Sequence, residues 1–112
     1  MNNTSRDMNQ NIFLITVFEK CEPSEKWYAD LGCTRSVGFR YTLEDAEEVV
    51  RNNMCDIWET CYNYACIEEL GAELYPFYKS RRFYKYNKVI DGYNPIAEPD
   101  CLKHIVPIGG IG

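Results

Sequence analysis

The chain has 112 residues, of which 46% are hydrophobic and 26% are charged, and its formal net charge is -5. This length indicates a single domain with one core, and the composition excludes intrinsic disorder. The negative charge argues against duplex nucleic acid or an anionic membrane as the main partner, and no apolar run approaches the ~20 residues that span a bilayer. We expect residues 1–10 to form a flexible tail and residues 11–112 to form one α+β domain.

Six cysteines are spread along the chain, and we expect no secretory leader before them. Cytoplasmic proteins keep their thiols reduced, so the sequence predicts free thiols and a cytoplasmic location. A zinc site needs a close pair of ligands such as C-x-x-C, which these spacings do not supply. His104 is the single histidine and lies far from most of the cysteines. We therefore expect neither a metal site nor a cofactor.

Two strands are expected in the first part of the chain. Residues 11–19 carry β-branched and aromatic side chains on both alternating faces, which is typical of a central strand covered on both sides. Residues 33–41 alternate more regularly, and Gly38 leaves a gap that indicates either a bulge or a close approach by a ligand or another backbone. The short connection between these segments favours an antiparallel pair.

Thr42 begins the clearest helix, because Thr42 and Asp45 approximate a capping box. The pair Asn52-Asn53 is a stop signal. Between these ends, one helical face carries an apolar stripe made of Leu43, Ala46, Val49 and Val50.

Two further strands are expected at residues 62–69 and 81–87, and the segment from His104 could add a short edge strand. The pairs Asp91-Gly92 and Asn94-Pro95 indicate turns. The predicted order is β-β-α-β-β, which describes a small antiparallel sheet of about four strands with one main helix packed on one face. Because the first strand is apolar on both faces, the face without a helix needs cover. A second subunit would supply it, so the sequence predicts a homo-oligomer.

Basic and aromatic residues are interleaved in residues 79–88, which contain no acid. Arginine binds phosphate through a planar fork, and tyrosine stacks on nucleobases. The segment predicts either an anion-binding surface or an edge strand whose charges prevent aggregation. On a strand, one face would carry Arg82, Tyr84, Tyr86 and Lys88, and the other would carry Arg81, Phe83 and Lys85.

Five other residues complete the candidate ligand-binding set. Arg35 and Arg40 flank Gly38, and Arg40 would join the basic stripe if the second and fourth predicted strands lie close together; otherwise both are surface arginines. Trp27 lies in a loop and would either stack on a ligand or close the end of the core. Glu68 and Glu69 would either bind ribose hydroxyls or remain solvated.

No known catalytic pattern occurs in the chain. The sequence contains no G-x-S-x-G, no P-loop and no G-x-G-x-x-G, and His104 has no nucleophile paired with it in sequence. We assign no catalytic residue and expect a protein that is not an enzyme.

A run of residues from Gly38 to Pro76 carries a family resemblance. The matching positions are Gly38-Phe39, residues 41–47, Asn53, Asp56-Ile57, Glu59, residues 62–65, residues 67–69 and residues 74–76. In these positions, about the middle third of the chain, it resembles a group of small uncharacterised proteins encoded by phages and prophages of gut Firmicutes. Arg40, where an aromatic is usual, and the extra cysteines depart from the group. The resemblance implies a phage-borne accessory protein in the host bacterial cytoplasm, a setting in which counter-defence factors are frequent.

We therefore expect a non-enzymatic counter-defence protein that sequesters a small anionic nucleotide immune signal in the pockets of a homo-oligomer. The expected ligand-binding residues are Arg40, Arg82 and Lys85 for the phosphates, Tyr84, Tyr86 or Trp27 for the base, Glu68 or Glu69 for the ribose, and Arg35 with no separate role. One alternative is an inhibitor that docks its acidic and aromatic surface on a host defence or nucleic-acid enzyme. Another is a small hydrolase of the same signal.

Overall fold

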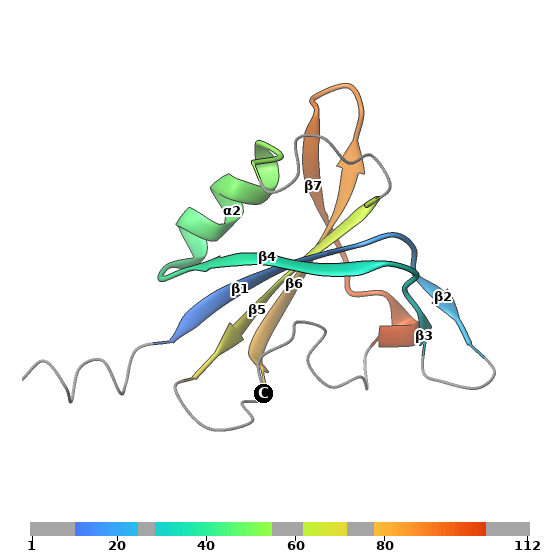
Figure 1. The fold of residues 1–112 in the computed structure, drawn as a ribbon, viewed down its shortest axis with the longest axis horizontal. Coiled ribbons are helices and arrows are strands. Elements are labelled where there is room, and N and C mark those ends of the chain that lie inside the picture. Colours follow the sequence, from blue (N-terminus) through green and yellow to red (C-terminus); the bar gives the residue numbers. More distant parts are fainter. Residues whose placement is uncertain (1–10, 25–28, 55–61, 72–77, 103–112) are drawn as a thin grey trace, which may run out of the picture.

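Five antiparallel strands form the main sheet in a computed structural model of the protein, which describes residues 11–24, 29–54, 62–71 and 78–102 (Figure 1). The elements in chain order are β1 (Ile12–Phe18), β2 (Glu22–Pro23), β3 (Ala29–Asp30), β4 (Thr34–Arg40), α2 (Leu43–Arg51), β5 (Tyr64–Leu70), β6 (Tyr78–Asn87), β7 (Gly92–Ile96) and the 3-10 helix η1 (Asp100–Leu102). The expected tail at 1–10 and the optional strand after His104 lie outside the described residues.

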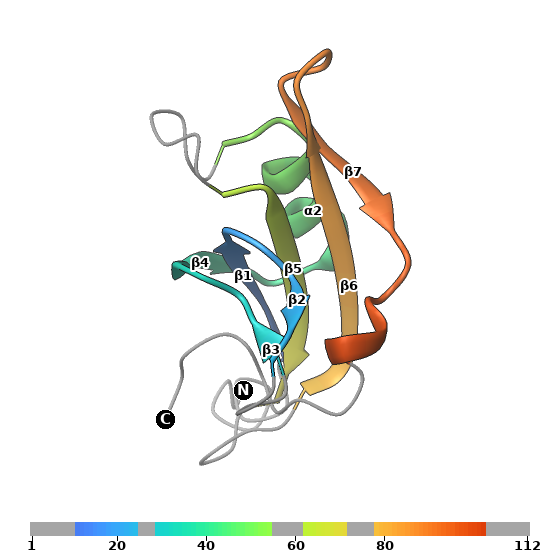
Figure 2. The ribbon, with the colours of Figure 1, turned by 90° about the vertical axis from the view of Figure 1, so that its right-hand side faces the viewer.

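The strands of the main sheet lie in the order β4-β1-β5-β6-β7, and every neighbouring pair is antiparallel. Strands β4 and β7 are therefore the two edges, and β2 pairs with β3 in a separate two-stranded sheet. Figure 2 shows β6 and β7 side by side, with the turn between them extending beyond the rest of the sheet.

Helix α2 begins where its capping residue predicts. The Thr42 hydroxyl accepts a hydrogen bond from the Asp45 main-chain N–H at 3.1 Å, which satisfies one of the donors left free at a helix start. At the other end, Asn52 caps the helix and Asn53 adopts a positive φ of 52°. The α+β class, the single α-helix within the described residues and its start at Thr42 are confirmed.

The larger core fills the space between α2 and the sheet. Ala46, Val49 and Val50 of the helix pack with Val17 of β1 and Ile67 of β5, which are interior strands of the sheet. Burial of each large apolar side chain stabilises the fold by roughly 1.5–3 kcal/mol. Five consecutive residues of β1, from Leu14 to Phe18, are buried, so the expectation of a central strand covered on both faces is confirmed.

A second core covers the opposite face of the sheet. Phe18, Cys66 and Phe83 pack there with Leu102 of η1, and Leu31 beside the β2–β3 sheet adds partial cover. The chain itself therefore supplies cover that the sequence argument assigned to a second subunit. That premise for a homo-oligomer is wrong, although self-association itself stays a prediction.

Two local features, at Gly38 and at the β6–β7 hairpin, refine or correct what the sequence predicts. The expected gap at Gly38 coincides with a shift in register, because Ile15 pairs with Gly38 whereas Thr16 pairs with Ser36. The sequence left open a bulge or a close approach by a ligand or another backbone, and the structure shows a bulge. The turn signal at Asp91-Gly92 closes a hairpin, and the chain continues as β7, which makes five strands instead of four. Pro95 is tolerated there because β7 is an edge strand.

The β7 strand starts against the last turn of α2. A Cβ atom on Gly92 would collide with the main-chain oxygen of Arg51, so the close approach of strand and helix requires glycine at this position. This contact holds the β6–β7 hairpin against the end of the helix. Among the described helices, none is long and apolar enough to cross a bilayer.

Candidate ligand-binding site

Strand β6 divides the basic and aromatic segment between the two faces of the sheet. Tyr84 and Tyr86 belong to the core under α2, whereas Phe83 belongs to the core on the opposite face. The predicted alternation is confirmed. Because Arg82 and Lys85 lie on opposite faces of one strand, the fold does not bring them into a single site within one protomer.

The two tyrosines of β6 are engaged within the fold. Tyr84 is buried, and its hydroxyl donates to a carboxylate oxygen of Glu47 at 2.7 Å. Burial and this hydrogen bond raise the pKa of Tyr84 well above its usual value. Tyr86 donates to Asp91 at 2.7 Å and packs edge-to-face on Tyr93, with ring centroids 5.4 Å apart. Each hydroxyl therefore donates its one proton to a carboxylate of the chain itself.

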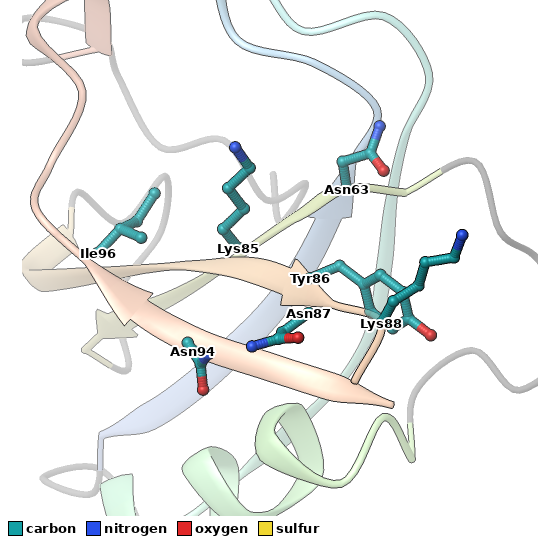
Figure 3. Close-up of a pocket in the computed structure, with 7 residues that line it drawn as sticks. All are labelled: Asn63, Lys85, Tyr86, Asn87, Lys88, Asn94 and Ile96. Atoms are coloured by element: carbon teal, nitrogen blue, oxygen red, sulfur yellow. The ribbon is translucent and has the colours of Figure 1, made fainter. Parts of the chain in front are cut away.

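An open pocket of about 500 Å³, with a lining that is more apolar than polar, lies where the β6–β7 hairpin meets the start of β5. Figure 3 shows the side chains of Asn63, Lys85 and Lys88 extending from the sheet on the side away from the helix. Lys85 and Asn94 are directly paired across the two strands. We call this cavity the hairpin pocket; it is lined by Asn63, Lys85, Tyr86, Asn87, Lys88, Asn94 and Ile96.

The ammonium groups of the hairpin pocket have no carboxylate partner within the described ranges. The Nζ atom of Lys85 lies 5.9 Å from the ring centroid of Tyr64, a cation–π contact that leaves its N–H donors available. Both Lys85 and Lys88 are exposed. In a chain of net charge -5, two unpaired ammonium groups beside one cavity favour an anion.

Two amide side chains of the pocket are oriented by bonds to the main chain. The side-chain nitrogen of Asn63 donates to the Glu19 carbonyl at 3.1 Å, which leaves the amide oxygen of Asn63 as a free acceptor. The side-chain oxygen of Asn87 accepts from the Val89 N–H at 2.9 Å, which leaves the amide nitrogen of Asn87 as a free donor. Within the described ranges neither the Asn63 oxygen nor the Asn87 nitrogen has a further partner, so the lining offers an acceptor and a donor in addition to its ammonium groups.

A second cavity, of about 380 Å³, lies on the helix side of β6. Arg51 of α2 and Arg82 of β6 line it with Glu47 and Tyr84. We call it the helix-side pocket. The carboxylates of Glu47 and Glu98 also line this pocket and offset part of the positive charge of its arginines.

The predicted acidic residues lie away from both ammonium groups. Glu68 is fully buried, and one of its oxygens lies 3.4 Å from a guanidinium nitrogen of Arg81. Glu69 accepts hydrogen bonds from Asn11 at 2.7 Å and Ser80 at 2.9 Å. Both carboxylates occur near the end of β5, whereas Asn63 lies just before its start, so the fold does not bring them into the hairpin pocket.

The arginines of β4 lie at the other edge of the sheet. Strands β1 and β5 separate β4 from β6, so the adjacency on which Arg40 would join the basic stripe does not occur. Arg35 and Arg40 are exposed, and Arg40 donates to the Phe39 carbonyl at 2.9 Å. Trp27 lies outside the described residues.

Sequence reasoning missed the amide residues of the hairpin pocket. Asn94 falls on a predicted turn, which is wrong because Asn94 and Pro95 lie within β7, and Asn87 falls at the end of a predicted strand. The register of β5 on β6 pairs Tyr64 with Lys85 and so places Asn63 beside the hairpin, and no local sequence signal indicates that register. Lys88 belongs to the predicted basic segment but not to the predicted ligand-binding set.

The chemistry available in the hairpin pocket is that of binding. Its lining supplies ammonium charge, amide donors and acceptors and one apolar wall at Ile96. Over the ranges described, no three histidine, cysteine, aspartate or glutamate side chains are grouped to hold a metal ion. No protein-family model, curated protein or solved structure matches the chain significantly.

Proposed function

We propose that the protein is a non-enzymatic phage counter-defence factor that binds a small anionic nucleotide signal in the hairpin pocket and withholds it from a bacterial immune effector. The observation that carries the proposal is the exposed Lys85 ammonium, which faces a cavity beside oriented amides and has no carboxylate partner in the described ranges. A volume of about 500 Å³ is in the range of small-molecule sites.

The lining suggests a role for each group. Lys85 and Lys88 would neutralise phosphate, and the amide nitrogen of Asn87 would donate to a phosphate oxygen. The free amide oxygen of Asn63 would accept from a base or a sugar hydroxyl. Phosphate is therefore proposed to bind Lys85 and Lys88. Arg82 stays a candidate for binding a separate anion in the helix-side pocket.

Sequestration needs no chemical step. The free concentration of a signal falls by mass action when binding sites outnumber it and the dissociation constant lies below its working concentration. The resemblance over Gly38 to Pro76 supplies the phage setting. Self-association remains part of the proposal, with the exposed edge strand β4 as its contact surface, because edge strands present unpaired main-chain groups.

The test is a thermal-shift and calorimetric screen against nucleoside monophosphates, cyclic mono- and dinucleotides and ADP-ribose. We expect at least one to bind, Lys85→Ala to weaken it at least tenfold, and Lys79→Ala on the same strand to leave it unchanged. Ligand recovered chemically intact by chromatography supports sequestration, and recovered fragments support the hydrolase. Absence of binding to every compound contradicts the proposal.

A specific surface favours a second candidate, an inhibitor that docks on a host protein. Phe39 and Tyr41 are exposed, and their rings meet edge-to-face with centroids 5.4 Å apart just before the first turn of α2. The exposed acids Glu44, Asp45 and Glu48 follow on the helix. A basic partner would fit this surface. Affinity capture from host lysate, with Tyr41→Ala as the variant, tests it: a stoichiometric partner lost with that variant favours the inhibitor.

A further inference from the structure

Two cysteines far apart in the sequence meet on the second face of the sheet. The Sγ atoms of Cys21 and Cys101 lie 3.4 Å apart, although the residues are separated by 80 positions. Cys21 follows β1 and immediately precedes β2, whereas Cys101 is the middle residue of η1. Both side chains are half-buried and pack against the second core.

This pair differs from the other described cysteines. Cys33 is exposed and Cys66 is fully buried in the second core, so neither shares the arrangement of two sulfurs in contact. A disulfide has its sulfurs about 2.05 Å apart, so the Cys21 and Cys101 sulfurs must approach by about a further 1.4 Å. Rotation of the two side chains about their Cα–Cβ bonds would bring the sulfurs together.

We propose that Cys21 and Cys101 form a reversible disulfide and are therefore a redox-modification site. The disulfide would covalently link η1 to the start of β2. The oxidant is a small-molecule disulfide such as oxidised glutathione. One cysteine sulfur attacks it, an S–S bond forms to one glutathione, and the other glutathione leaves as a thiol after taking up a proton. The second cysteine then displaces the bound glutathione. Two electrons and two protons pass to glutathione, and the glutathione disulfide bond is replaced by the one in the protein.

The bond would stabilise a contact that the fold already uses. The Leu102 carbonyl, next to Cys101, accepts a hydrogen bond of 2.6 Å from the buried guanidinium of Arg81. Leu102 and Ile96 belong to the same core as the two cysteines. A covalent link at Cys101 therefore holds η1 over the second core. It also lowers the conformational entropy of the unfolded chain, which stabilises the folded state.

The pKa of Cys21 bears on the rate. Burial, with a contribution from the hydrogen bond to Cys101, raises the pKa of Cys21 to about 12. The thiolate is the nucleophile in disulfide exchange, so Cys21 is mostly in the unreactive form at neutral pH. We therefore expect slow formation at pH 7 and faster formation at pH 9.

The experiment incubates the full chain with graded ratios of reduced and oxidised glutathione. Peptide mapping by mass spectrometry under non-reducing conditions is expected to find one peptide that joins Cys21 to Cys101, lighter by 2 Da than the sum of its parts. The oxidised protein is expected to melt about 10 °C above the reduced protein. Cys33→Ser is the matched control and should keep both effects, whereas Cys21→Ser and Cys101→Ser should each lose both.

Two outcomes would overturn the proposal. The first is glutathione attached separately to Cys21 and Cys101 with no peptide joining them at any ratio. The second is cross-linking distributed over other cysteines to the same extent. Because the mapping is done on the unsubstituted chain, the conclusion does not depend on whether either serine variant folds.

Discussion

Arg81 and Glu68 form an ion pair from which water is excluded, because 1% of the Arg81 side chain and none of the Glu68 side chain is exposed. Glu98 approaches the same guanidinium at 3.0 Å, and Phe83 lies beneath it with its ring centroid 5.3 Å away. A charge buried in this way is tolerated only while it stays paired and hydrogen-bonded. Part of the basic segment therefore holds β5, β6 and η1 together.

The first prediction concerns Arg81→Met. The substitution leaves the Glu68 carboxylate buried without its guanidinium partner and is expected to lower the free energy of unfolding by about 3–5 kcal/mol. Arg82→Met, on the neighbouring exposed position of β6, is the matched control and is expected to change it by less than about 0.5 kcal/mol. Urea unfolding followed by circular dichroism measures both. Equal effects of the two variants would contradict the distinction.

The contrast between Arg81 and Arg82 shows where sequence reasoning stops. Alternation along residues 81–87 places the two arginines on opposite faces, and that is confirmed. The face that excludes water is the one that η1 covers. Leu102 of η1 lies 21 positions after Arg81, so no local sequence pattern indicates this contact. Strand β1 and the Thr42 cap could be predicted because their signals are local. The hairpin pocket could not be, because it arises from the register of β5 on β6.

Tyr84→Phe is expected to lower stability by about 1 kcal/mol, because it removes the hydrogen bond to Glu47 from a buried hydroxyl. The pH dependence has a definite sign. The pKa of Tyr84 is raised in the folded state, so its stabilising contribution is complete below pH 10 and is lost as the pH rises from 10 toward the folded pKa. Urea midpoints from pH 8 to pH 11 test this: the difference between the wild type and Tyr84→Phe should shrink above pH 10, and a constant difference would contradict it.

Gly92→Ala tests the contact between helix and hairpin. The added methyl group would collide with the Arg51 carbonyl oxygen, so β7 must move away from α2, at a cost of about 1–3 kcal/mol in the free energy of unfolding. Asn94→Ala on the same strand is exposed and is expected to change stability by less than about 0.5 kcal/mol. Thermal unfolding of both variants gives the comparison. If Gly92→Ala melts with the wild type, the close approach is not a constraint.

Asn87→Asp tests whether the charge of the hairpin pocket controls binding while the local structure is kept. The acid keeps the oxygen that accepts from the Val89 N–H, so the turn and the melting temperature should be preserved. The amide donor becomes a carboxylate oxygen in the lining that Asn87 shares with Lys85 and Lys88, which removes a donor and repels an anion. For any nucleotide that binds the wild type, calorimetry should show at least tenfold weaker binding. Thr34→Asp, which adds the same charge on the far edge strand β4, should leave the affinity within twofold. A ligand that binds Asn87→Asp as tightly as the wild type does not occupy this pocket.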